Sequence, residues 1–371
     1  MLRVLLLNDV QLLRTVLYEL PFLILLFMLI ETAARSVLKR LLYMVLNVIV
    51  SFLSVAFLLY YDYFGTLMSY HDLKQSGQVA SVSDSIVLLL HPLHGLFFID
   101  VPILLLFFFL FRNRTDSEPI FEWRTRVIGM IIPAVFLIVH FFSANEEDLL
   151  IPERFAHKYG LFTYEAYQLY FDKVIKAAAN VHFTRDDIMT LKGNEEIPLE
   201  QSPHFGVAKG RNLILVQLES FQNFALHLSI DGEEITPTMN ALADTSFYFP
   251  NLYQQIGAGN TSDAEFLANT SLYPVGSLPT SEAAGDKEIP SLPRLLNEEG
   301  YRTATFHAHT IEYWNRDELY PALGFEKYYD ISYFEKTDWI GFGPSDEVFY
   351  DGVIELLTKD EVTEPFYAHV L

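Results

Sequence analysis

The stretch I-G-A-G-N-T-S-D-A-E-F, residues 256–266, places two adjacent hydroxyls between a glycine-rich turn and an acidic, helix-forming run. Ser262 and Glu265 have the S-x-x-E spacing of a capping box, which predicts that Ser262 caps the helix. Thr261 then stands just ahead of the helix, where free N–H groups and the positive end of the helix dipole favour a phosphate. Gly257 and Gly259 let the backbone approach closely, as an anion-binding turn requires.

A threonine hydroxyl is a useful nucleophile only when a base or a metal ion helps it to lose its proton. Glu219 ends the apolar run N-L-I-L-V-Q-L, at the place where α/β proteins collect ligands. A carboxylate there suits a hard divalent cation. A solvated acid in the first turn after a strand fits the position of Glu219 just as well. If Glu219 holds a cation, that cation can activate Thr261.

A third group of candidates lies in F-H-A-H-T-I-E-Y-W-N-R-D-E-L-Y, residues 306–320. His307 and His309 alternate along an expected strand and so share one face, which suits a metal ion or phosphate oxygens. Trp314 offers a flat apolar surface, and Arg316 offers a planar fork for phosphate. Each of these residues alone is more often a packing residue or part of a surface ion pair. Together with the two earlier motifs, they describe a pocket for a phosphorylated polyol.

The elements that must position these residues alternate between apolar runs and helical stretches. Strand-like runs start at residue 212, at 302 and at 365, and helices are expected over 291–301 and 344–360. This alternation predicts βαβ units around a parallel sheet. We found no P-loop and no G-x-G-x-x-G fingerprint.

Charge and composition differ between the two halves of the 371 residues. The formal net charge of -22 belongs to the second half, since positions 1–143 hold 10 acidic and 10 basic residues and the remainder holds 37 acidic and 15 basic residues. Such an acidic half argues against binding nucleic acid, and it must offset its charge to bind an anionic substrate. The chain has no cysteine, which excludes disulfides and thiolate metal sites.

The first half predicts a helical membrane domain. Residues 43–61 are 19 consecutive uncharged positions, about enough to span a hydrocarbon core of roughly 30 Å. The four expected spans are 15–34, 43–61, 96–111 and 127–143. Basic residues lie between the first two spans and between the last two, which predicts that both loops are cytoplasmic and that everything after residue 143 is outside. Those residues are Arg35, Lys39, Arg40, Arg112, Arg114, Arg124 and Arg126.

Asp100 lies at the edge of the third span. It can be a functional intramembrane acid or an interfacial residue. Four spans with the second half outside place the amino terminus outside as well, but the first residues have no export signal of the usual kind. We therefore expect the chain to lack its natural beginning.

The order Q-L-E-S, G-N-T-S-D-A-E-F and F-H-A-H-x-x-x-Y-W-N-R-D resembles the lipoteichoic acid synthase family of the alkaline phosphatase and sulfatase superfamily. Family members place several membrane spans, usually five, ahead of an extracellular α/β catalytic domain. The resemblance implies a transmembrane domain over 1–145, a helical connector over 146–205 and a sulfatase-like catalytic domain over 206–371. It also implies a multi-pass protein of the cell membrane.

The resemblance further implies that Thr261 is the nucleophile and that Glu219 and Thr261 belong to a site for Mn²⁺ or Mg²⁺. It implies that Trp314 and Arg316 contact a glycerol phosphate head group, with His307 and His309 also in the substrate site. Family enzymes take glycerol phosphate from phosphatidylglycerol through a covalent threonine intermediate and release diacylglycerol. They add the unit to a glycolipid or polyglycerol phosphate acceptor during cell wall biogenesis.

Two differences from the family pattern limit which residue roles can be transferred from the family to this chain. The family can place an acidic residue at the position of His309. The remaining metal ligands of the family, an Asp-His pair, and another substrate histidine lie beyond the last residue of this chain. We therefore expect a fragment, truncated at the carboxyl end and also at the amino end, that does not turn over by itself.

Two other functions stay open from the sequence. Phosphoethanolamine transferases share the threonine, and sulfatases share the superfamily, although sulfatases usually use a modified Cys or Ser. The W-N-R sequence at 314–316 favours glycerol phosphate transfer over both. A non-catalytic membrane protein that binds a partner or senses cations is the alternative from another class.

Overall fold

The computed structural model divides into two compact units, Met1–Ala179 and Asn180–Leu371. The structure describes residues 2–7, 12–33, 36–70, 72, 83–111, 121–178, 190, 201, 203–276, 278–334, 336–340, 343–359 and 363–371. The predicted cytoplasmic residues Arg35, Arg112 and Arg114 lie outside these ranges, as does much of the predicted connector.

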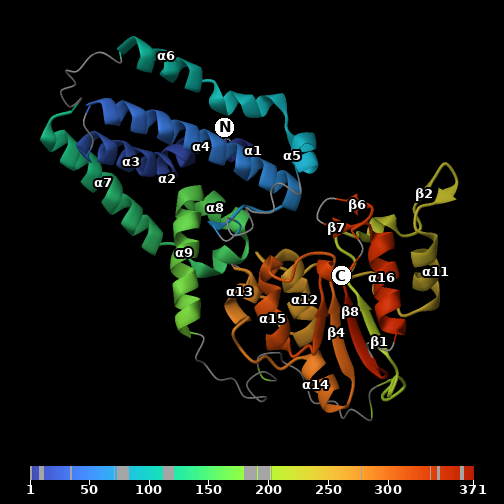
Figure 1. Ribbon diagram of the computed structural model, residues 1–371. Coiled ribbons are helices and arrows are strands. Elements are labelled where there is room, and N and C mark those ends of the chain that lie inside the picture. Colours follow the sequence, from blue (N-terminus) through green and yellow to red (C-terminus); the bar gives the residue numbers. More distant parts are fainter. Residues whose placement is uncertain are drawn as a thin grey trace. The chain divides into compact units, whose positions relative to one another are not determined.

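The described residues of the first unit form helices and short loops and contain no strand (Figure 1). Its helices are α1 (Leu2–Leu7), α2 (Leu12–Tyr18), α3 (Leu20–Ala33), α4 (Ser36–Phe64), α5 (Ser83–Leu89), η2 (Pro92–Phe98), α6 (Val101–Phe111), α7 (Trp123–Phe142), η3 (Glu146–Leu150), α8 (Pro152–Tyr159) and α9 (Leu161–Ala178). Within the described part of the chain, three stretches are long and apolar enough to cross a membrane: Leu38–Phe64, Pro92–Leu110 and Trp123–Phe142. Leu20–Thr32 is a shorter apolar helix, so the expected span over 15–34 stays a prediction.

Polar side chains inside the apolar helices of this unit pair with one another. Lys39 Nζ donates to Glu31 Oε1 at 2.9 Å, and the Tyr43 hydroxyl donates to Glu31 Oε2 at 2.9 Å. Asn47 Nδ2 donates to Asp100 Oδ2 at 2.7 Å. Pairing of this kind lowers the cost of placing polar groups among apolar helices.

The second unit contains a four-stranded sheet in the order β1-β8-β4-β5, with every neighbouring pair parallel. The strands are β1 (Leu213–Val216), β4 (Arg302–Phe306), β5 (Lys327–Tyr329) and β8 (Phe366–Val370). Two short hairpins, β2 (Ser229–Ile230) with β3 (Glu233–Glu234) and β6 (Trp339–Ile340) with β7 (Gly343–Pro344), stand apart from the sheet. The predicted α/β class and the parallel sheet are confirmed.

Helices cover both faces of this sheet. They are η5 (Asn223–Ala225), α11 (Pro237–Thr245), α12 (Asn260–Thr270), α13 (Thr280–Ala284), α14 (Leu292–Glu298), η6 (Tyr313–Asn315), α15 (Arg316–Leu323), η7 (Ile331–Tyr333) and α16 (Asp346–Thr358). Figure 1 shows α12 and α15 on one side of the sheet and α16 on the other. The expected helices over 291–301 and 344–360 correspond to α14 and α16, and Ser345 is the N-cap of α16.

The central strand β8 is buried along its whole length because it has helices on both faces. Successive side chains of a strand point to opposite faces. Phe366, Ala368 and Val370 accordingly join the apolar cluster with Phe349 of α16. Tyr367 joins the cluster with Phe266 of α12 and residues of α15. His369 therefore points toward α12, beneath the carboxyl edge of the sheet.

Candidate active site

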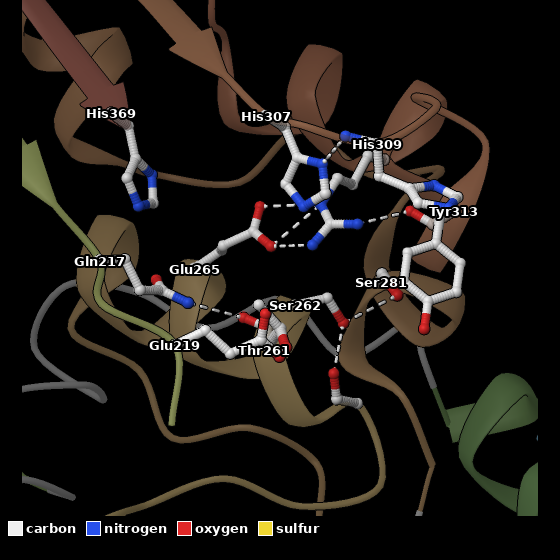
Figure 2. A network of polar contacts seen from close by, with 12 residues as sticks. Gln217, Glu219, Thr261, Ser262, Glu265, Ser281, His307, His309, Tyr313 and His369 are labelled. Atoms are coloured by element: carbon white, nitrogen blue, oxygen red, sulfur yellow. Dashed lines mark hydrogen bonds and ion pairs between the residues drawn. The ribbon is translucent and has the colours of Figure 1, made fainter. Parts of the chain in front are cut away.

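Thr261 and Glu219 meet at the carboxyl edge of the sheet (Figure 2). Thr261 Oγ1 donates to Glu219 Oε1 at 2.9 Å, although the two residues lie 42 positions apart. Glu219 follows β1 and is exposed, and Thr261 lies in the first turn of α12. Gln217 Nε2 donates to the backbone oxygen of Thr261 at 3.2 Å, which adds a second link between the end of β1 and α12. The structure thus brings together the expected nucleophile and the expected metal ligand.

The start of α12 differs from the predicted capping box. The helix begins at Asn260, with Gly259 as N-cap and no side-chain cap, so Thr261 lies inside the helix instead of just ahead of it. Ser262 is buried, and its hydroxyl donates to the oxygen of Gly259 at 2.9 Å. Glu265 is also buried and points away from the helix end. The capping-box prediction for Ser262 and Glu265 is therefore wrong.

Asp263 takes the place of that cap. Its Oδ2 accepts the N–H groups of Gly257 and Gly259 at 3.0 Å each, and its Oδ1 accepts the N–H of Thr280 at 2.9 Å. Burial raises the pKa of Asp263, although these three hydrogen bonds act in the opposite direction. The amides of the glycine turn are bound by an internal carboxylate, so the expectation that this turn binds an anion is wrong.

Gly257 has a packing reason to be glycine. A Cβ at this position would lie 2.3 Å from the backbone oxygen of Gly276. The same carbonyl accepts the N–H of Ala258 at 2.9 Å. Close approach of two backbone segments therefore holds the turn that leads into α12.

His307 and His309 follow β4, which ends at Phe306, so the prediction that both lie on the strand is wrong. The chain turns there, and the N–H of His309 donates to His307 Nδ1 at 2.9 Å. Burial, and then the charge of Arg316, lower the pKa of His307 well below its usual value and lower the pKa of His309. His307 is thus a neutral ring at pH 7, with its proton assigned to Nε2 because Nδ1 is an acceptor.

Arg316 is fully buried and forms an ion pair with Glu265. Arg316 Nη2 donates to Glu265 Oε1 at 2.5 Å, Nε donates to Oε1 at 3.0 Å, and Nη1 donates to the oxygen of Tyr313 at 2.8 Å. Burial alone would lower the pKa of Arg316, but the charge of Glu265 raises it above its ordinary value. The guanidinium is therefore a fixed cation with a partner.

Trp314 is buried too, with 5% of its surface exposed. Trp314 and Asn315 both have left-handed backbone angles, φ 59° and φ 54°. Asn315 Nδ2 donates to the oxygen of Ser281 and to Glu318 Oε2, each at 3.0 Å. These contacts hold the strained turn that starts α15 and sets the direction of Arg316.

His369 lies near Glu265 and Arg316, and the sequence did not single it out. Its Nδ1 lies 3.1 Å from Asn269 Nδ2, and Asn269 Oδ1 accepts the hydroxyl of Tyr367 at 2.8 Å. Its Nε2 is buried and has no hydrogen-bond partner among the described residues. Burial lowers the pKa of His369 to about 4. Its position two residues before the end of a strand-like run was the only available signal.

The described residues contain no group of three or more His, Asp or Glu side chains placed to hold a metal ion. Glu219 and Thr261 supply one carboxylate and one hydroxyl. Hard divalent cations prefer oxygen ligands of this kind, so the donor set fits such an ion in part.

Comparison with known proteins identifies both units. Residues 6–177 match the family model described as lipoteichoic acid synthase N-terminal domain, and residues 211–371 match the one described as sulfatase. The chain thus has a domain matched by the amino-terminal model of lipoteichoic acid synthases, followed by a domain matched by the sulfatase model. The resemblance drawn from the motifs is confirmed, and the first match assigns the apolar helices to the membrane domain of that family.

Individual relatives agree with this assignment. Lipoteichoic acid synthase 2 of Bacillus subtilis (strain 168) is 30% identical over 336 residues, which cover 87% of this chain and 51% of the relative. Lipoteichoic acid synthase of Staphylococcus aureus (strain USA300) is 28% identical over 338 residues, which cover 87% of this chain and 52% of the relative. The chain thus spans about half the length of the curated relatives it matches.

Among solved structures, the lipoteichoic acid synthase LtaP from Listeria monocytogenes is similar to this chain with a TM-score of 0.47 and 41% identity, covering 51% of this chain and 46% of LtaP. A protein of the alkaline phosphatase superfamily from Vibrio parahaemolyticus gives a TM-score of 0.37 and 23% identity, covering 43% of this chain and 40% of that one.

Asp263→Asn should destabilise the second unit, because an amide cannot accept all three N–H groups. Each buried N–H left without an acceptor costs about 1–3 kcal/mol. We expect a lower melting temperature by circular dichroism. Asp351→Asn, an exposed aspartate on α16, is the matched control and should melt like the wild type. An Asp263→Asn variant as stable as the control would contradict the assigned network.

His369 should make stability depend on pH. The folded state keeps the ring neutral down to about pH 4, whereas the unfolded chain binds a proton near pH 6.5. Stability is therefore complete above pH 6.5 and falls as the pH decreases toward 4, by about 2 kcal/mol between pH 6.5 and 5. His369→Gln should remove this part of the dependence in urea unfolding, and exposed His227→Gln should not. Equal pH profiles for wild type and His369→Gln would show that the ring is not held neutral.

Proposed function

We propose that this chain belongs to a membrane glycerophosphotransferase that uses phosphatidylglycerol as donor. The observation that carries the proposal is the hydrogen bond from Thr261 Oγ1 to Glu219 Oε1 at the carboxyl edge of the sheet. Ligands of parallel α/β sheets bind at this edge. The contact lies in a chain with the membrane and sulfatase domains of the lipoteichoic acid synthase family. The acceptor in this reaction is a glycolipid or a polyglycerol phosphate chain.

The reaction is a two-step displacement at phosphorus. Thr261 Oγ1 attacks the phosphorus of phosphatidylglycerol, and the bond between phosphorus and the diacylglycerol oxygen breaks. Diacylglycerol leaves with a proton, and Thr261 becomes a phosphodiester of glycerol. A hydroxyl of the acceptor then attacks the same phosphorus, and the Thr261 oxygen leaves and regains a proton. Glu219 accepts the hydroxyl hydrogen in the resting state and so orients a lone pair of Thr261 for attack.

A divalent cation, Mn²⁺ or Mg²⁺, would be held by Glu219 and Thr261. When bound, it lowers the pKa of the hydroxyl and offsets the charge of the phosphodiester. Such compensation matters here because the second half of the chain holds 37 acidic and 15 basic residues. Apart from the cation, the proposed reaction depends on the positions of side chains in the second unit.

We assign the glycerol phosphate group to the side of the site formed by residues 307–316. His307 offers a neutral N–H donor, and Arg316 offers a fixed guanidinium. His309 and Trp314 complete this side of the site as substrate-binding residues. Neutral donors and a paired cation can hold non-bridging phosphate oxygens through directed hydrogen bonds. The sulfatase domain then acts on the outer face of the cell membrane, where the acceptor polymer grows.

Thr261→Ala should reduce diacylglycerol release by at least about 10³-fold, because the attacking oxygen is gone. The measurement incubates the full-length protein in detergent micelles with labelled phosphatidylglycerol and Mn²⁺. Thr270→Ala, at the other end of α12, is the matched control and should keep its activity. Release that survives Thr261→Ala would refute Thr261 as nucleophile. If the protein transfers phosphoethanolamine and not glycerol phosphate when it is given mixed lipids, the donor is phosphatidylethanolamine and not phosphatidylglycerol.

A further inference from the structure

Glu265 has no lone pair left for substrate or metal. It is 1% exposed, and both of its oxygens accept hydrogen bonds inside the unit. Oε1 accepts from Arg316 Nη2 at 2.5 Å and from Arg316 Nε at 3.0 Å. Oε2 accepts from the hydroxyl of Tyr320 at 2.8 Å and from Arg316 Nε at 3.2 Å. Any role of Glu265 in catalysis must therefore act through Arg316.

Arg316 is fully buried, and its contacts leave two of its N–H groups without a hydrogen-bond partner among the described residues. Of the five N–H groups of an arginine, one on Nε and one on Nη2 point to Glu265, and one on Nη1 points to Tyr313. One N–H on each terminal nitrogen remains for a further acceptor. Donors on the two terminal nitrogens can each meet an oxygen of a phosphate. The direction in which they point is set by the carboxylate behind them.

Glu265 and the proposed nucleophile, Thr261, lie on the same helix. Thr261 and Glu265 are four residues apart on α12, so they lie on the same face of the helix, one turn apart. Figure 2 shows Glu265 between Thr261 and His307, with His369 on the far side of the carboxylate. Asn269, one turn further along, donates through Nδ2 to the backbone oxygen of Glu265 at 2.8 Å. One rigid helix thus holds Thr261 and the partner of Arg316 at a fixed separation.

The energetics of buried ion pairs favour an orienting role. Removing two charges from water costs about as much as their attraction returns, so such a pair adds little stability over an apolar pair of the same shape. The pair instead fixes the orientation of Arg316, because its planar guanidinium meets both oxygens of Glu265 in one geometry. Tyr320 donates one further hydrogen bond to the second oxygen, which lowers the cost of burying the carboxylate, while Arg316 alone sets its orientation.

We propose that Glu265 is a positioning residue for phosphate transfer. It holds the guanidinium of Arg316 in one orientation relative to the hydroxyl of Thr261, so that the two remaining N–H groups meet the non-bridging oxygens of the phosphate under attack. The inference rests on the proposed transfer of glycerol phosphate and assigns a new residue to that site.

The test compares Glu265→Gln and Glu265→Asp with Arg316→Lys in the full-length protein. Misplacing a group by about 1 Å can cost about 10²-fold in rate, so we expect kcat for diacylglycerol release to fall by about that factor in both Glu265 variants. Arg316→Lys should fall similarly, and the Glu265→Asp, Arg316→Lys double variant should be no worse than Arg316→Lys alone. Tyr320→Phe removes a hydrogen bond from the same carboxylate but leaves the fork in place, so its kcat should stay within about threefold of wild type.

A second readout measures the affinity of each variant for glycerol phosphate by titration calorimetry, below the melting temperature of each variant. If the wild type releases no diacylglycerol but binds glycerol phosphate, and Glu265→Gln weakens that binding, the transfer reaction is refuted and the positioning role stands. If the wild type turns over and Glu265→Gln keeps its kcat within about threefold, the positioning role is refuted and the pair only supports the fold. A wild type that neither binds nor transfers would overturn both.

Discussion

The hydrogen bond between Thr261 and Glu219 depends on the parallel pairing of β1 with β8. That pairing fixes the end of β1, because Leu213–Val216 lie beside Tyr367–Val370 and the N–H of Gln217 continues the ladder to the oxygen of Val370. Glu219 follows two residues later. On the other side, α12 is packed through Phe266 against the same sheet. The hydrogen bond between Thr261 and Glu219 therefore depends on the register of β1 against β8 and on the position in which α12 packs against the sheet.

Two buried acids near Thr261, Asp263 and Glu265, have internal hydrogen-bond partners. Asp263 accepts three backbone N–H groups, and Glu265 accepts Arg316 and Tyr320. Burying an unpaired carboxylate would cost several kcal/mol, so these partners lower the cost of burying the two acids. Glu219 alone is exposed. Of these three acids, only Glu219 is therefore exposed to solvent while it contacts Thr261.

Periodicity and residue type predicted much of this arrangement, while contacts between distant segments could not be predicted. The apolar runs predicted β1, β4 and β8, and the motifs predicted the family and, through it, a common site for Glu219 and Thr261. The S-x-x-E spacing was misleading, because Asp263 binds the glycine turn and a residue 51 positions away takes Glu265. Pairing over such distances is set by packing of α12 on α15, and a single sequence carries no direct signal of it. His369 was missed because a histidine within an apolar run has no local pattern.

The account makes Thr261 a covalent carrier of glycerol phosphate, and mass spectrometry tests this most directly. Full-length protein is quenched with acid during turnover of phosphatidylglycerol and digested, and the peptide that contains Thr261 is analysed. The account predicts that this peptide gains the mass of one glycerol phosphate unit, located on Thr261 by fragmentation and absent from Thr261→Ala. Diacylglycerol release without any adduct on that peptide, or with the adduct on another residue, would contradict it.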